Sequence, residues 1–376
     1  MNKSLILLFF IIPLFQSCYE IGGKDYLSSS SSAGVSSDPG SGSATLASQV
    51  IEELKSSLSS LLSFRSSRDS NSRSSSFKLN SDDIDHLLAG AEKAIIESNL
   101  TDSEDLTLVL QKIAEGAQTS IIGITPIADK DNRTMSLIGV IGGSMIKSIN
   151  GRTQYLKATS ARTNPTPLEN ALSGITQVSI SNMDEAGLPP SLVATASKSV
   201  VGSLVGSLDE GGLSKNEIGG ALKNITSKAV DSLDQIAGVS PSDITSSLKE
   251  ITSGATSALD QIEVSDYSAS DLGEMVQEIS SGATQALGNI KIDGISSDNL
   301  SSMMEKVTAG ATGALGQISM EGYSSSNLTT MLSKITSGAT SALGDIEMEG
   351  YSSNNLSLMV EKITAGATSA LSLIHI

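Results

Sequence analysis

The side chains that most often carry out chemistry are scarce in this 376-residue chain. It has two histidines, His86 and His375, and a single cysteine, Cys18. A serine–histidine–aspartate relay or a histidine-based metal centre needs several such groups that converge on one point. His86 stands beside two leucines in a predicted helix, where an exposed or hydrogen-bonded role is the ordinary one. We therefore expect no enzyme activity, no metal site and no bound cofactor.

Two motifs that could hold phosphate or calcium are incomplete. The glycines within residues 139–143 lack the Lys-Ser/Thr pair of a nucleotide-binding loop. Asp129, Asp131 and Asn132 alternate as in a calcium loop, but the central glycine and the distal glutamate of that loop are missing. The net charge of −17 repels nucleic acid. We expect neither a nucleic-acid partner nor a small-molecule substrate.

Cys18 is the residue for which the sequence indicates a chemical modification. Lys3 and the apolar residues 5–15 have the pattern of an export signal, and the apolar run is too short to span a bilayer. A lone cysteine directly after such a signal cannot form an internal disulfide, and it stands where bacterial lipoproteins accept lipid. We predict a signal peptide at 1–17 and membrane attachment through diacylglycerol and fatty acyl groups on Cys18. An ordinary secretory signal with an incidental cysteine is the alternative.

Serine dominates the segment that follows the signal. Residues 18–78 include serine-rich runs at 28–32 and 70–76 and carry too few apolar side chains to offset the entropy cost of folding. We therefore predict a disordered tether. Apolar residues at helical spacing within 46–64 predict one short helix in it, either at a membrane interface or docked on the body.

A six-residue motif, Gly-Ala-Thr-x-Ala-Leu, occurs five times with a fixed period of 28 residues. Its glycines are Gly254, Gly282, Gly310, Gly338 and Gly366. A constant period of this length is typical of stacked units that bury a shared core. Apolar residues between the copies of this motif recur at steps of three and four residues, which predicts helices. We predict an all-α helical repeat array, either a solenoid or an elongated bundle.

The array is expected to span residues 79–371, with about ten or eleven units. Its units are diverged over 79–224 and regular over 225–371. Within the diverged part, the prolines in residues 124–133 and 163–167 predict longer loops. The hexapeptide from Leu371 to Ile376 breaks the repeat, because glycine is expected after Leu371, and it is what the adapter-like DNA sequence CTG TCT CTT ATA CAC ATC encodes. We expect 372–376 to be a non-native tail and the natural chain to continue with further repeats.

The predicted helices share one start signal: an apolar residue, serine, two residues, an acid or amide, and a second apolar residue. In the copy at 323–328, Ser324 and Asn327 can form a capping box, and Tyr323 and Leu328 have the spacing of a hydrophobic staple. The pattern recurs at Ser214 and Glu217, Ser240 and Asp243, Ser268 and Asp271, Ser296 and Asn299, and Ser352 and Asn355.

Each repeat could hold one helix or two. One helix from about Ser325 to Ile346, followed by a short linker, requires consecutive helices to run antiparallel. The alternative is a helical hairpin broken near Ser337 and Gly338, because glycine is unfavourable inside a helix. Glycine that recurs with alanine four residues later also favours close contact between helix backbones.

Taken together, the signal with its loose lipid-acceptor motif, the serine tether and the 28-residue repeats resemble repeat-containing outer-envelope lipoproteins of leptospires and related spirochaetes. The resemblance implies a cell-surface protein that contacts host extracellular-matrix or plasma proteins. Tyr267, Tyr323 and Tyr351 are the candidate partner contacts, because aromatic residues are enriched at binding hot spots; their alternative role is the hydrophobic staple. A periplasmic or envelope spacer without a host ligand is the second hypothesis for function.

Overall fold

A computed structural model describes residues 103–124, 132–149, 166–262, 267–290, 296–318, 324–346 and 352–371. These residues form helices and turns and contain no strand, which confirms the predicted all-α repeat array. The signal peptide, the tether with its helix at 46–64, the first units of the predicted array and the tail at 372–376 lie outside the described residues.

Ten α-helices and two short 3-10 helices make up the described part of the chain. The α-helices are α5 (Ser103–Ile124), α6 (Asn132–Ser148), α8 (Pro167–Glu185), α9 (Pro190–Gly206), α10 (Lys215–Asp231), α11 (Pro241–Ser257), α12 (Ala269–Ala286), α13 (Ser297–Leu315), α14 (Ser325–Leu343) and α15 (Ser353–Leu371). The 3-10 helices η2 (Ser232–Gln235) and η3 (Ala258–Gln261) directly follow α10 and α11.

The predicted capping boxes are present at the starts of α10 to α14. In α14 the backbone N–H of Ser324 donates to Asn327 Oδ1 at 2.8 Å, and the backbone N–H of Asn327 donates to Ser324 Oγ at 3.3 Å. The same pair of bonds joins Ser352 and Asn355 at α15. These bonds satisfy amide groups that a helix leaves without partners in its first turn, so each repeat marks its own helix start.

One capping box lies where the sequence analysis assigned no helix start. Thr166 and Glu169 form reciprocal bonds at the start of α8, and Pro167 occupies the first helical position. Threonine, proline and glutamate at these positions are a recognised helix-start signal. The neighbouring prolines had suggested a loop instead.

Each repeat holds a single helix, and the predicted hairpin alternative is wrong. The helix α14 runs from Ser325 to Leu343 without a break at Ser337 or Gly338. It ends three residues before the predicted Ile346, because a turn follows in which the N–H of Ile346 donates to Leu343 O at 3.4 Å. Ile346 remains buried, so its apolar side chain belongs to the core although it lies beyond the helix.

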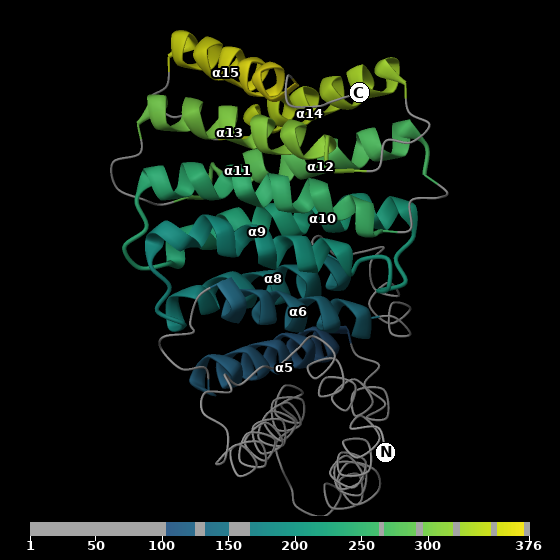
Figure 1. Cartoon of the computed structure of the whole chain (residues 1–376), viewed down its shortest axis with the longest axis vertical. Helices are drawn as coiled ribbons and strands as arrows, with labels where there is room; N and C mark the ends of the chain where they lie inside the picture. The colour runs from purple at the N-terminus through teal and green to yellow at the C-terminus, as the bar shows by residue number, and fades with distance from the viewer. Residues whose placement is uncertain are drawn as a thin grey trace, which may run out of the picture.

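The helices form two rows, and each packs mainly against the next described helix of its own row (Figure 1). One row contains α5, α8, α10, α12 and α14, and the other contains α6, α9, α11, α13 and α15. Helices that follow each other in sequence belong to different rows along the regular part and share a smaller contact. The buried leucine, isoleucine, valine, methionine and alanine side chains form one core through the stack.

Helices of one row run parallel, and consecutive helices run antiparallel. Lys215, at the start of α10, forms a 3.8 Å ion pair with Asp271 in the first turn of α12, so the two N-terminal ends lie together. Residues 186–189 alone connect α8 to α9. Four residues cannot return along a helix of about 28 Å, so the chain must reverse. The 28-residue sequence period therefore corresponds to one helix, whereas the structural unit contains two.

The recurring glycines allow close backbone contact between neighbours in a row. A Cβ atom added at any of them would lie less than 3.0 Å from a backbone carbonyl oxygen of the preceding helix in that row. The carbonyls belong to Lys198, Lys223, Lys249, Gln277 and Glu305, and they face Gly254, Gly282, Gly310, Gly338 and Gly366 respectively. A side chain here would force two helix backbones apart, which explains why glycine recurs despite its poor helix propensity.

We expect Gly310→Ala to lower the free energy of unfolding by about 1–3 kcal/mol, because the new methyl group overlaps the carbonyl of Lys249. Gly313→Ala, three residues later in α13, is the matched control. Its Cβ would lie 3.9 Å from Ala370 Cβ, an ordinary contact, so better helix propensity should raise stability by up to about 1 kcal/mol. Urea unfolding followed by circular dichroism measures both variants. Equal effects of the two variants would contradict the close-contact interpretation.

Candidate functional site

Most residues predicted to have a functional role lie outside the described residues. This applies to Cys18, Tyr323 and Tyr351. Their predicted roles stay predictions. Tyr267 is the one candidate partner contact that the structure describes.

Tyr267 is half-buried and packs against the hydrophobic core just before α12. The Lys215 ammonium lies 4.5 Å from the centre of its ring, a cation–π contact with the preceding helix of the same row. Both contacts tie Tyr267 to its own fold, so they favour the structural role over that of an exposed binding residue.

Asp271 completes the polar cluster beside Tyr267. Its carboxylate accepts a 2.7 Å bond from the backbone N–H of Ser268 and a 2.9 Å bond from the Ser268 hydroxyl. These bonds, the backbone one first, lower the pKa of Asp271 below 3.8, and the charge of Lys215 adds to the effect. The cluster therefore secures the start of α12 and its contact with α10.

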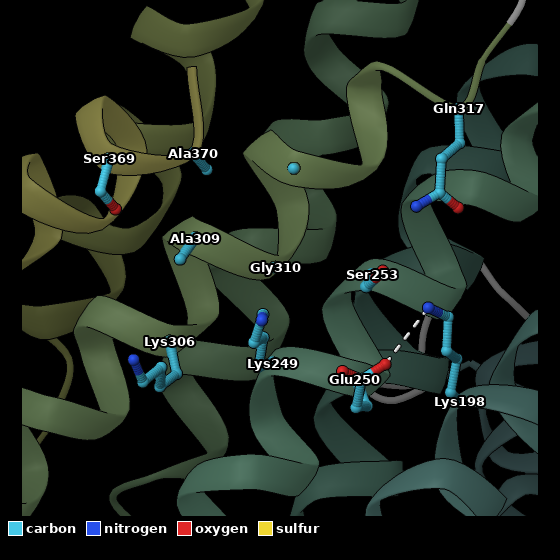
Figure 2. A pocket seen from close by; sticks show the side chains of 11 residues that line it. Lys198, Lys249, Glu250, Ser253, Lys306, Ala309, Gly310, Gln317, Ser369 and Ala370 are labelled. Atoms are coloured by element: carbon cyan, nitrogen blue, oxygen red, sulfur yellow. Dashed lines mark ion pairs between the residues drawn. The ribbon is translucent and has the colours of Figure 1, made fainter. Parts of the chain in front are cut away.

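A groove crosses the row formed by α9, α11, α13 and α15 (Figure 2). It has a volume of about 310 Å³. Small residues of α13 and α15 leave this space open, because Gly310, Gly313, Ala309 and Ala370 fill little of it. Its other lining residues are Lys198, Lys249, Glu250, Ser253, Lys306, Gln317 and Ser369.

The groove carries more positive than negative charge, although the chain as a whole is acidic. Lys198 pairs with Glu250 at 3.2 Å. Figure 2 shows Lys249 between that pair and Lys306, and Lys249 forms no ion pair with another described residue. Lys306 lies 3.9 Å from the carboxylate of Glu305, outside hydrogen-bond distance.

Glu305 is already held by another lysine, so it neutralises Lys306 poorly. The Lys362 ammonium donates to Glu305 at 2.8 Å. That hydrogen bond and the negative charge of Glu305 raise the pKa of Lys362 above 10.5. The Lys249 ammonium, and the Lys306 ammonium with its long 3.9 Å ion pair, can thus contact an external anion.

The chemistry of this groove suits binding. Ammonium groups beside apolar walls can hold a carboxylate or phosphate while an attached apolar group lies along the floor. The lining contains no histidine, cysteine or pair of carboxylates that could act as an acid, a base or a nucleophile. Nor do His, Cys, Asp and Glu side chains of the described ranges gather in any group of three or more that could hold a metal ion.

A second polar cluster lies between α5, α6 and α8, and it is structural. Gln118 is fully buried; its amide donates to Ser179 at 2.8 Å and to Ile138 O at 3.2 Å, and its carbonyl oxygen accepts from Asn182 at 2.6 Å. A buried network with its partners satisfied rigidifies the contact of three helices. It offers no exposed group to a ligand.

Sequence reasoning missed the groove. Lys249 stands five residues before Gly254, whereas Lys306 stands four residues before Gly310, so the two lysines occupy different positions of the repeat. The period alone also does not place helices two repeats apart side by side. The groove was therefore not predictable from the spacing.

No protein-family model and no curated protein matches this chain. Among the helices that the structure describes, none combines the length and the apolar character that crossing a membrane requires.

We expect Asp271→Asn to remove a pH-dependent part of the stability. Because folding lowers the pKa of Asp271 from 3.8, its contribution is complete above pH 3.8 and is lost as the pH falls through the lowered pKa. The difference in thermal unfolding midpoint between wild type and Asp271→Asn should therefore shrink in acid. The reciprocal change Asn299→Asp should introduce the same acid sensitivity at α13. A difference that stays constant over this pH range would contradict the assignment.

Proposed function

We propose that this protein is a lipid-anchored bacterial envelope protein that presents its helical array at the cell surface for binding a partner protein. The export signal, the lone Cys18 and the serine tether support export and attachment to the membrane. The groove across α9, α11, α13 and α15 supports the binding role, and it is the observation on which that role depends.

The proposed ligand is an acidic segment of a host extracellular-matrix or plasma protein. Four adjacent helices of one row, 8–10 Å apart, cover about 24–30 Å, the reach of roughly eight extended residues. Carboxylate groups on such a segment complement Lys249, which forms no ion pair with another described residue, and Lys306, whose ion pair with Glu305 is long at 3.9 Å. Nucleic acid is the less suitable polyanion, because the net charge of −17 repels it at a distance.

A structural spacer within the envelope is the second candidate function. The continuous core of the two-row stack supports it, because a rod with one core can hold its length between two attachment points (Figure 1). The spacer needs neither the lysines of the groove nor exposure to the cell exterior. Location and binding therefore distinguish the two functions.

On intact cells, we expect added protease to degrade the helical array, because the proposal places it outside the outer membrane. Wild-type protein should be labelled by palmitate and sediment with membranes. Cys18→Ser should lose the label and appear in the soluble fraction. A periplasmic protein serves as the control for membrane integrity. Protection of the array in intact cells would move the protein inside the envelope and favour the spacer.

In the binding assay, the unacylated full chain is titrated against immobilised laminin, fibronectin and plasminogen as probes. We expect Lys249→Gln combined with Lys306→Gln to weaken binding roughly two- to thirty-fold, since each exposed ion pair contributes about 0.2–1 kcal/mol. High salt should weaken the wild type in the same direction.

The matched control for that assay combines Lys223→Gln with Lys334→Gln. It removes the same charge from α10 and α14 in the other row. Equal loss in both double variants would show that only net charge matters. Absence of binding to all three probes would favour the spacer.

A further inference from the structure

The large apolar side chains that the described residues expose all lie on α15. Leu356, Val360 and Leu371 are 38%, 41% and 37% exposed. Their spacing of four and eleven residues places them on one side of the helix, beside the stripe that contains the buried Met359 and Ile363. The exposure is therefore confined to one face of the last described helix.

The preceding helix of the same row shows what this face normally contacts. The residues of α13 at the same repeat positions are Leu300, Met304 and Leu315, which are 6%, 0% and 0% exposed because α15 covers them. The exposed face of α15 thus has the composition of a helix–helix interface inside this array.

Threonines of α15 are likewise exposed where their counterparts in α13 are buried. Thr308 of α13 is fully buried, and its hydroxyl donates to Ile363 O of α15 at 2.9 Å. Its counterpart Thr364 is exposed and donates to Val360 O of its own helix. Thr312 of α13 is likewise buried, whereas its counterpart Thr368 is exposed.

The other row ends in a similar way. Thr284 of α12 is fully buried beneath α14, and its counterpart Thr340 of α14 is exposed. Ser280 of α12 is also fully buried, and its counterpart Thr336 is half-buried. We call the surface formed by Thr336, Thr340, Leu356, Val360, Thr364, Thr368 and Leu371 the end face.

We propose that the end face docks a helix pair of the same repeat type, with a glycine of each incoming helix against the backbone of α14 or α15. The proposal continues an interface that this structure already contains. Gly338 meets the carbonyl of Gln277 in α12, and Gly366 meets that of Glu305 in α13. Two repeats further along the chain, the residues that correspond to Gln277 and Glu305 are Ser333 and Glu361. We expect the incoming glycines to lie against their carbonyls.

A symmetric pair of end faces is a poorer occupant. Gly338 and Gly366 are both buried against the preceding helices of their rows, so the end face itself presents no repeat glycine. Two such faces would meet through threonine and valine side chains and could not bring their backbones into close contact. The required partner carries the complementary glycine face, which is the face of a repeat helix pair.

The test uses full-length Cys18→Ser protein that also carries Val360→Cys, so that a thiol reagent reports exposure of the end face. The probe is a peptide that copies residues 324–371, added in excess. The second arrangement appends a copy of residues 316–371 after Leu371, which keeps the repeat register and removes the entropy cost of association.

We expect thiol labelling to slow at least ~tenfold in one or both arrangements, and the thermal unfolding midpoint to rise. Gly338→Val with Gly366→Val in the added copy should abolish both effects, because the glycine contact is lost. Asn354→Asp in the chain should change neither, because its counterpart Asp298 is exposed in α13 even with α15 in place. That variant is the control for a substitution on α15 outside the end face.

Unchanged labelling in both arrangements would overturn the proposal. So would protection that the glycine variants retain in full, since another kind of contact would then cover the face. Labelling that slows with the concentration of the chain alone, and that the peptide does not alter, would assign the face to a symmetric dimer and also overturn it.

Discussion

Close contact between the backbones of neighbouring helices in a row is the constraint on which the rest of this structure depends. At each of the five repeated glycines, the helix backbone lies against a carbonyl of the preceding helix in the row. A threonine of the preceding helix, Thr226, Thr252 or Thr308, lies beside three of these contacts. Without the glycines the two backbones would have to separate, and the small side chains between them would no longer fill the interface.

The threonine side chains show how an interface of small residues keeps its polar groups satisfied. Thr252 lies two residues before Gly254, is fully buried, and donates to Leu248 O of its own helix at 2.9 Å. The hydroxyl thus finds a partner within its own helix, and the same oxygen faces Gly310 of the neighbouring helix. Thr256, Thr284 and Thr312 differ, because their buried hydroxyls form no hydrogen bond with a described residue. Burying a hydroxyl in this way opposes folding by about 1–3 kcal/mol. The size and shape of the side chain, rather than its hydrogen bonding, therefore account for threonine at these positions.

The same use of small residues links the fold to the proposed binding role. Gly310 allows α13 to pack closely against α11, and it also lines the groove. The lysines around it come from three helices, α9, α11 and α13, that are distant in sequence. Since each unit contacts mainly its neighbours, changes in groove residues can alter binding without disturbing the whole array.

The sequence by itself determined where most of the regular helices begin and which of their residues are buried, because capping boxes and apolar periodicity act within one helix. The boxes at Ser240, Ser268, Ser296 and Ser324 are examples. It also predicted that consecutive helices run antiparallel, since that follows from linker length. The start of α8 was missed because its prolines were interpreted as a loop.

Only the tertiary structure decided which helices are neighbours. A period of 28 residues is the same for a stack of successive helices and for two rows of alternating helices, so spacing alone could not place Lys249 beside Lys306 or Gly310 against Lys249. That choice depends on how far two backbones approach each other in space. Contacts between residues about two repeats apart set that distance. The recurring glycines predict a close contact, but they do not say which helix is the partner.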